Sequence, residues 1–293
     1  MADWRAEYEK AVLCGDIGNA KRIVAENSGN IYLLKFFRGT MRQLNTVMSE
    51  KFWLSNAKFF NDPYDSLSLA NVRSKLIYDR YDPAERKLAV EEYENQVKSN
   101  AVAYDIQSSI FVTCFSETSL ENLHMWSYYA DEHKGFCVEY SLPKMIERGI
   151  HILPVVYTEE WEADRSIPDF KTQVALIKSK AWAHEKEWRI VCVDPIHSQE
   201  RGIAIDGITP TNIYVGCRDQ LHINDNWDLY SELKKTFSKH PNTLNYVWGN
   251  KNRKISLNEI IDACEKNKSK NITVYSMELD ESGFGTSKRK VIY

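Results

Sequence analysis

Two glutamates near residue 186 are the most chemically suggestive pair in the sequence. Glu185 and Glu187 lie two positions apart, so on a strand their side chains would point to one face. Two like charges on one face raise the pKa of one carboxyl group and separate an acid from a base. A fixed carboxylate in a dry site also stabilises positive charge that develops in a transition state. We take Glu187 as the first catalytic candidate and Glu185 as the second.

The same segment has a structural interpretation, in which Glu187 simply belongs to a ladder of ion pairs. Lys180, Lys186 and Arg189 are close enough in sequence to supply the cations. His184 adjoins the glutamates as a candidate base, although neighbouring strand positions face opposite ways.

Candidate phosphate and ribose contacts lie elsewhere. Arg38 could hold a pyrophosphate by paired contacts, and Gly39 would let the backbone approach the ligand. Arg189 is a second candidate phosphate ligand, with the alternative that it pairs with an internal carboxylate. Asn61 and Asp62 open a turn signal; they either satisfy a rigid turn or stand at the rim of a cleft, where Asp65 would join them.

An unusually aromatic segment runs from residue 122 to residue 133. On a helix Asn122, Trp126 and Tyr129 share one face, and His124 and Tyr128 share another. Such a face could stack a nicotinamide or a nucleobase, and the alternative for a tryptophan here is the protein core. His133 precedes a glycine at a strand start.

Metal and nucleotide motifs give little support to other chemistries. Two clusters of ligand-type residues exist without an HExxH or HxH spacing, and no zinc motif follows. A magnesium-dependent nuclease built on acidic residues is the second hypothesis. No GxGxxG, Walker loop or GxSxG elbow occurs. The residues concerned are Glu117, His124, Asp131, Glu132 and His133 for the first cluster, and Asp62, Asp65, Glu185 and Glu187 for the nuclease.

Composition indicates an ordinary globular protein. The chain has 293 residues, is 43% hydrophobic and 27% charged, and carries a net charge of -3, so no overall basic field marks a nucleic-acid binder. Early charged residues argue against a signal peptide, no apolar run could span a membrane, and the six cysteines form no CxxC pair. We therefore expect a cytoplasmic protein, with Cys114, Cys137 and Cys192 as small buried hydrophobes.

The patterns predict helices over 3–29 with a break at Gly15-Asp16, and over 41–50, 67–106, 121–130, 169–181, 226–239 and 257–267. They predict strands over 31–37, 52–54, 110–116, 135–140, 152–157, 187–193, 213–216 and 272–279. Because the strands cluster with few β–helix–β alternations, the predicted class is α+β: a central bent or split, mainly antiparallel sheet with flanking helices.

The predicted organisation is a helical N-terminal cap over 1–29 and a single α+β domain over 30–293. Within that domain, 67–106 is a helical insertion and 219–270 is a helical segment. The N-terminal hairpin either covers the domain or docks a partner protein, because one hairpin is too little for a solenoid.

Several motifs in order resemble the bacterial family called domain of unknown function 2971. The resemblance spans roughly residues 31 to 279 and is carried by Tyr32-Leu-Leu-Lys-Phe-Phe-Arg38, Phe60-Asn-Asp-Pro-Tyr-Asp65, Thr113-Cys-Phe-Ser-Glu117, Met125-Trp-Ser-Tyr-Tyr-Ala130, His133-Lys-Gly-Phe-Cys-Val-Glu-Tyr140 and Lys180-Ala-Trp-Ala-His-Glu-Lys-Glu-Trp-Arg189.

A more distant resemblance is to ADP-ribosyltransferases, whose sites combine an Arg or His, a Ser-containing strand and a Glu-x-Glu element in that order. Arg38, Ser116 and Glu185-Lys-Glu187 occur in that order, although Phe-Ser-Glu stands where that fold usually has Ser-Thr-Ser. The resemblance implies NAD as a substrate, no metal, and a toxin or phage-defence role on a protein or nucleic-acid acceptor. Arg38 would hold the phosphates, Ser116 with Trp126 or Tyr128 would shape the nicotinamide pocket, and Glu187 would stabilise the ribosyl cation.

Two hypotheses remain beside ADP-ribosyl transfer. They are the magnesium-dependent nuclease and a non-enzymatic sensing or interaction module that uses the N-terminal helices as its docking surface. Transfer requires NAD, nuclease activity requires a divalent ion, and a binding module tolerates loss of Glu187.

Overall fold

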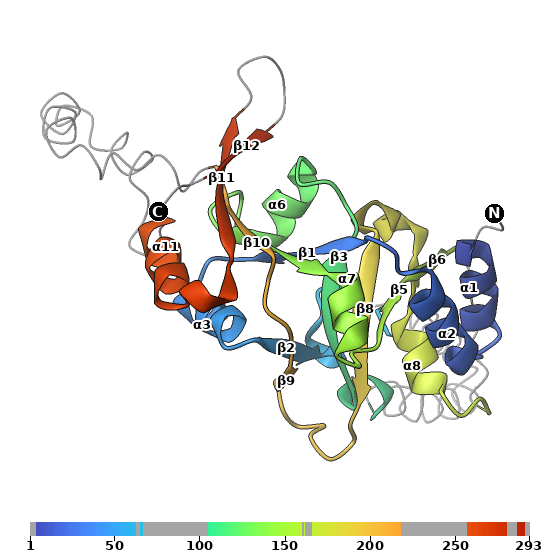
Figure 1. Cartoon of the computed structure of the whole chain (residues 1–293). Coiled ribbons are helices and arrows are strands. Elements are labelled where there is room, and N and C mark those ends of the chain that lie inside the picture. The colour runs from blue at the N-terminus through green and yellow to red at the C-terminus, as the bar shows by residue number, and fades with distance from the viewer. Residues whose placement is uncertain are drawn as a thin grey trace, which may run out of the picture. The chain divides into compact units, whose positions relative to one another are not determined.

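The computed structural model describes residues 4–62, 65–66, 105–159, 161, 166–217, 257–279 and 286–290. These residues form a mixed α+β protein with a large, mainly antiparallel sheet, flanking helices and two N-terminal helices, as predicted (Figure 1). The chain divides into two compact units. The first contains residues 1–33, 51–117 and 142–207, and the second contains 34–50, 118–141 and 208–293.

The first unit is built on five antiparallel strands in the order β9-β2-β3-β8-β5. Their bounds are β2 Lys51–Asn56, β3 Ile110–Ser116, β5 Ile152–Pro154, β8 Glu187–Val193 and β9 Gly202–Asp206. A separate parallel pair joins β6 (Val156–Thr158) to β7 (Ile177–Ser179). The strands β3 and β8 pair along their whole length, from Ile110 opposite Val193 to Ser116 opposite Glu187. The candidate functional site lies at the Ser116–Glu187 end of this pairing.

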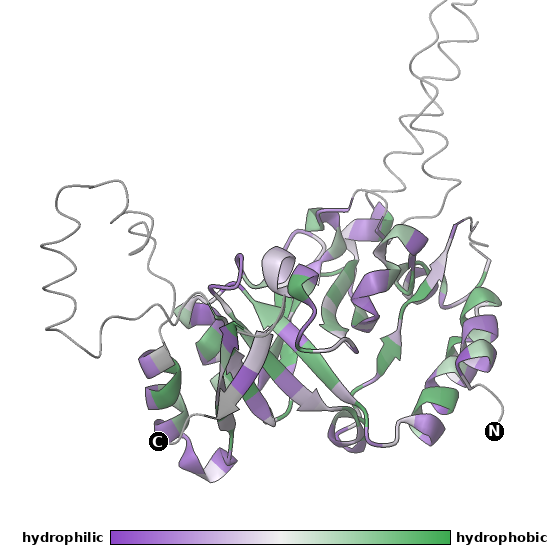
Figure 2. Ribbon diagram, turned by 90° about the horizontal axis from the view of Figure 1, so that it is seen from above, coloured by the Kyte–Doolittle hydropathy of each residue, from purple (hydrophilic) through white to green (hydrophobic). Residues whose placement is uncertain are grey.

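Helices of the first unit follow the amphipathic pattern of the sequence. They are α1 Trp4–Leu13, α2 Ile17–Asn27, α7 Leu142–Glu147, α8 Phe170–Ala175 and the short 3-10 helices Ala57–Phe59 (η1) and Lys180–Glu185 (η4). Both N-terminal helices alternate apolar and polar bands (Figure 2), and α2 buries Ile17, Ala20, Ile23 and Val24. The break between them is the predicted one: Gly15 has φ +79, and Asp16 caps α2 by accepting from the Asn19 amide.

The second unit has four strands in the order β4-β10-β11-β12. They are β4 Phe136–Ser141, β10 Asn212–Val215, β11 Thr273–Leu279 and β12 Thr286–Lys290, and only β10 and β11 run parallel among them. Its helices are α3 Met41–Met48, α6 Leu123–Tyr129, α11 Leu257–Lys266 and the 3-10 helix Lys268–Lys270 (η6). The strand β1 (Tyr32–Phe37) begins in the first unit and ends in the second.

Most predicted elements are confirmed, and two departures have physical reasons. The helix predicted over 169–181 ends at Ala175, because Ile177–Ser179 pairs with β6 instead. The single strand predicted over 152–157 is two strands that pair with different partners. The predicted helices over 226–239 and most of 67–106 lie outside the described residues. The elements α7, β7, β9 and β12 were not predicted.

Two further findings bear on the sequence predictions. The six cysteines are free thiols; Cys137 is buried as predicted, whereas Cys114 and Cys192 are only half-buried. Within the described part of the chain, no helix is long and apolar enough to cross a membrane.

Candidate functional site

A turn at Lys186 places the two glutamates of the Glu-x-Glu segment. Glu185 is the last residue of η4, and Glu187 is the first residue of β8. Between them Lys186 has φ +45 and ψ +52, a left-handed conformation that costs a non-glycine residue about 1 kcal/mol. Both glutamates are nonetheless buried, at 3% and 5% exposure. The expectation that both lie on one strand is therefore wrong for Glu185.

The two carboxylates still converge, because both reach one ammonium group. Lys178 on β7 donates from Nζ to Oε2 of Glu185 at 2.7 Å and to Oε2 of Glu187 at 3.1 Å. The Lys178 side chain is itself only 6% exposed. A hydrogen-bonded ammonium between two carboxylates offsets their mutual repulsion and fixes their separation.

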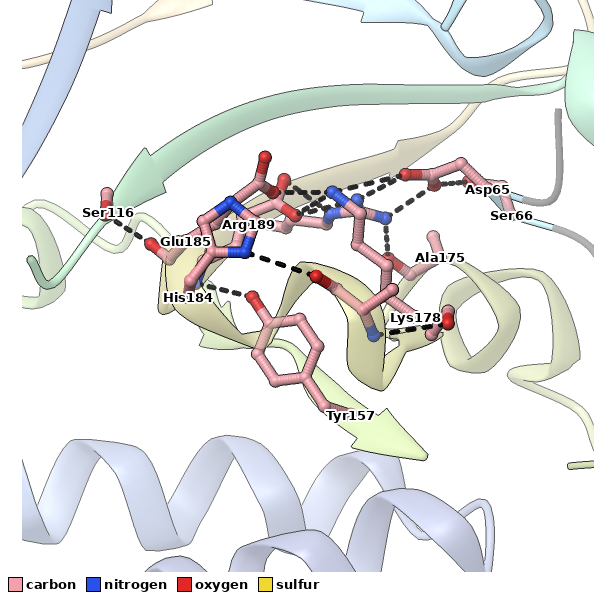
Figure 3. Close-up of polar contacts among 12 residues, drawn as sticks. Asp65, Ser66, Ser116, Tyr157, Ala175, Lys178, His184, Glu185 and Arg189 are labelled. Atoms are coloured by element: carbon pink, nitrogen blue, oxygen red, sulfur yellow. Dashed lines mark hydrogen bonds and ion pairs between the residues drawn. The ribbon is translucent and has the colours of Figure 1, made fainter. Parts of the chain in front are cut away.

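Arg189 joins this pair to a distant segment of the sequence. It donates from Nε and Nη2 to Glu187 at 2.9 Å each, and from Nη1 and Nη2 to the two oxygens of Asp65 at 2.8 and 2.6 Å. The second Nη1 proton goes to the carbonyl of Ala175 at 2.7 Å (Figure 3). A guanidinium group has five N–H donors, and all five have protein acceptors here. Of the two roles foreseen for Arg189, the geometry matches the internal partner of a carboxylate.

The cations keep Glu187 ionised despite its burial. Burial alone raises the pKa of a carboxyl group, but the charges of Arg189 and Lys178 outweigh it and lower the pKa of Glu187 to about 2. Burial lowers the pKa of Lys178 and of Arg189, but the carboxylates around them outweigh it and raise the pKa of both. The predicted rise in pKa for one of two neighbouring carboxylates therefore does not occur at Glu187.

Two aromatic side chains border the cluster. Tyr157 on β6 accepts a hydrogen bond from the Glu187 amide at 2.9 Å, and burial raises the pKa of its hydroxyl, as do the nearby carboxylates. Trp182 of η4 is half-buried, and the Lys178 ammonium lies 4.8 Å from the centre of its ring. We call Asp65, Lys178, Glu185, Glu187 and Arg189 the acid–base cluster.

The acid–base cluster has unequal numbers of acids and bases. Three carboxyl groups face two cations among the residues that the structure describes, which leaves a formal excess of one negative charge. Burying several charged groups together is costly, and buried clusters with shifted pKa values are enriched at functional sites. A carboxylate fixed in a site shielded from water can stabilise positive charge that develops on a substrate.

Ser116 meets the Glu-x-Glu segment as the motif order suggested. It is the cross-strand partner of Glu187, and its Oγ donates to the backbone carbonyl of Glu185 (Figure 3). Since Ser116 is only 1% exposed, its hydroxyl serves the protein backbone in this structure.

The remaining candidates of the first unit lie in the turn after η1, and they differ in burial and in their contacts. Asn61 is exposed, whereas Asp62 is 8% exposed and its carbonyl accepts from the Asp65 amide at 3.2 Å. Asp65, 3% exposed, is the member of this turn that enters the acid–base cluster.

Other candidates belong to the second unit. Arg38 is exposed at the end of β1, and Gly39 beside it is buried with φ +81. Trp126 is 1% exposed in the core of that unit, and its Nε1 donates to the Leu120 carbonyl at 2.7 Å, so this ring is core. Tyr128 is 58% exposed and stacks on His124 at 6.0 Å, as the predicted shared helix face requires.

Metal binding gains no support from geometry. In the ranges that the structure describes, no group of three His, Cys, Asp or Glu side chains is arranged to hold a metal ion. The acidic residues foreseen for a magnesium site that enter the acid–base cluster, Asp65, Glu185 and Glu187, are bonded to Lys178 and Arg189.

Sequence reasoning missed two members of this site. Lys178 fell inside a predicted helix, and Tyr157 at the end of a predicted strand drew no attention as a site residue. A lysine close in sequence to a Glu-x-Glu pair could be predicted to bind it, but several lysines here meet that condition. Nothing local in the sequence marks Lys178 rather than Lys180.

Comparison with known proteins adds one finding. Residues 125–190 match the family model described as protein of unknown function (DUF2971). This DUF2971 match contains most of α6, the parallel pair β6–β7 and four members of the acid–base cluster, Lys178, Glu185, Glu187 and Arg189. No curated protein matches the chain. No solved structure matches it either.

Proposed function

We propose that the chain transfers ADP-ribose from NAD to a protein or nucleic-acid acceptor, using the carboxylates Glu185 and Glu187. The observation that supports this most is the buried pair of carboxylates, Glu185 and Glu187, which share the Lys178 ammonium beside the turn at Lys186. The two motif pieces that lie in the first unit also meet, since Ser116 pairs with Glu187 and bonds to Glu185. Arg38, the third piece, lies in the second unit.

The chemistry requires a stabilised cation. The bond between ribose C1′ and the nicotinamide nitrogen breaks, and its electron pair leaves with neutral nicotinamide. The ribose becomes oxocarbenium-like, as in glycoside hydrolysis, and the acceptor attacks C1′ and releases a proton. A carboxylate fixed near C1′ stabilises the positive charge without reorganisation, which is worth several kcal/mol in a dry site.

The contacts suggest different roles for the two glutamates. Glu187 accepts three hydrogen bonds from Arg189 and Lys178, so it holds the cluster together and keeps its charge. Glu185 is the last residue of a short helix, and it shares the Lys178 ammonium with Glu187. Because Arg189 and Lys178 both bind Glu187, we propose Glu187 as the positioning group and Glu185 as the group that faces the ribose.

The test uses labelled NAD with whole-cell lysate, comparing the wild type with E185Q and E187Q. Removing a charge-stabilising group lowers the rate by roughly 100- to 1000-fold, so both variants should lose transfer of label to macromolecules. R22Q is the matched control, because Arg22 pairs only with neighbours on the exposed face of α2 among its described contacts. Transfer by E185Q at the wild-type rate would refute the role of this carboxylate.

A further inference from the structure

The turn at Lys186 is held from outside by two consecutive residues at the end of β3. The Ser116 hydroxyl donates to the Glu185 carbonyl, and the Glu117 amide donates to the Lys186 carbonyl at 2.9 Å. Two successive carbonyls of the turn are thus bound by two successive residues of another strand. The left-handed Lys186 needs such support, because strained backbone persists only where its surroundings over-determine it.

The Glu117 side chain makes two further contacts. Its Oε2 accepts a hydrogen bond at 2.9 Å from the indole Nε1 of Trp188, the residue that follows Glu187. Both of its oxygens also accept from Nη2 of Arg5 on α1, at 2.8 and 2.7 Å. The Glu117 carboxylate therefore links the N-terminal helix to Trp188, which follows the turn that carries the glutamate pair.

The helix α1 is fixed to the same unit by further buried contacts. The Tyr8 hydroxyl donates to the Pro154 carbonyl, and the Gln173 amide donates to the carbonyls of Val12 and Leu13 at 2.7 and 3.1 Å. The Arg5 and Glu117 side chains are 43% and 28% exposed, so their ion pair sits at the surface, where it can open without unfolding the core.

We propose that Ser116 and Glu117 are positioning residues for the Glu185–Glu187 pair, and that the Arg5–Glu117 contact makes the geometry of this pair depend on the docking of α1. This role deepens the proposed function and rests on it for the effect on turnover. The N-terminal helix is then a control element of the site: when α1 is displaced, the Lys186 turn loosens and the carboxylates lose their fixed position.

Hydrogen exchange tests the structural part without any activity. Exchange is followed by mass spectrometry on peptides that cover residues 180–190 in the wild type, R5Q, R5K, E117Q and S116A. Loss of a partly exposed charged contact should speed local exchange roughly three- to tenfold in R5Q and E117Q, whereas R5K keeps the charge and the wild-type rate. R22Q is again the control, since its ion pair with Glu26 is remote from the turn in sequence and on another helix.

The outcomes separate the two proposals. Faster exchange confined to the turn, with lower kcat and unchanged KM for NAD, supports positioning of the glutamates. Faster exchange in the turn together with no NAD turnover by the wild type supports the coupling and overturns the proposed function. Wild-type exchange in R5Q and E117Q, or an equal increase across the first unit including peptides of β9, overturns the inference.

Discussion

Removing Arg189 should destabilise the protein more than any surface change. The side chain is 0% exposed and donates four hydrogen bonds to Asp65 and Glu187, whose side chains are 2% and 6% exposed. In R189M the methionine restores much of the volume, so a cavity is not the cause of the loss. Leaving a buried charge without its partner costs about 3–5 kcal/mol. Lys178 remains beside both carboxylates, which places the expectation at the lower end of that range.

Urea unfolding at pH 7, followed by circular dichroism, measures this loss. R22M is the matched control: the same substitution breaks an ion pair between side chains that are 62% and 56% exposed, and a pair of that kind contributes at most about 0.5 kcal/mol. R189K keeps the charge but not the fork of donors, so it should fall between the two. It also serves as the measurable variant if R189M does not fold.

The pH dependence gives a second check on the same prediction. In the wild type Glu187 is ionised to lower pH than a free carboxyl group, whereas in R189M its pKa returns toward the usual value. The difference in stability between the two proteins should therefore shrink between pH 7 and pH 3. A loss in R189M within 1 kcal/mol of that in R22M, or a difference that grows on acidification, would refute the account of the acid–base cluster.

Two other predictions concern a titration and a close backbone approach. The folded pKa of Glu187, about 2, lies below its ordinary 4.5, so Glu187 contributes stability that is present above pH 4.5 and is lost as pH falls toward 2. That contribution is about 3 kcal/mol. Between pH 5 and pH 3 the free energy of unfolding, measured with urea, should fall less in E187Q than in the wild type, and an equal fall in both proteins would count against this. G135A places a Cβ 2.0 Å from the Phe37 carbonyl oxygen and should lower the free energy of unfolding by more than about 2 kcal/mol. G149A has open space around it but φ +75, and should lower it by about 1 kcal/mol. Similar melting temperatures for the two variants would contradict the packing argument.

The sequence predicts the strands that frame the site better than it predicts the site. The apolar runs over 110–116 and 187–193 are strands with those bounds, because each is a short β-branched and aromatic segment. The helix predicted over 169–181 is wrong after Ala175, since Ile177 and its neighbours gain a partner strand that is distant in sequence.

The acid–base cluster depends on contacts that no local pattern contains. Pairing of Arg189 with Asp65 spans 124 residues, and Glu185 and Glu187 meet at Lys178 on either side of the left-handed residue Lys186. The alternative of an ion-pair ladder foresaw cations near Glu187, and Arg189 is one of them. The other cation is Lys178 rather than Lys180, which pairs with Glu159 on the surface.

A dual-label experiment on the purified chain tests the central claim most directly. NAD is labelled with one isotope in adenine and another in nicotinamide, and is incubated with the protein and lysate. Cleavage of the C1′–nitrogen bond predicts free nicotinamide and an equal amount of adenine label on macromolecules, both lowered at least about 100-fold in E185Q. Retention of both labels in intact NAD, or release of nicotinamide that E185Q does not change, would contradict ADP-ribosyl transfer by this site.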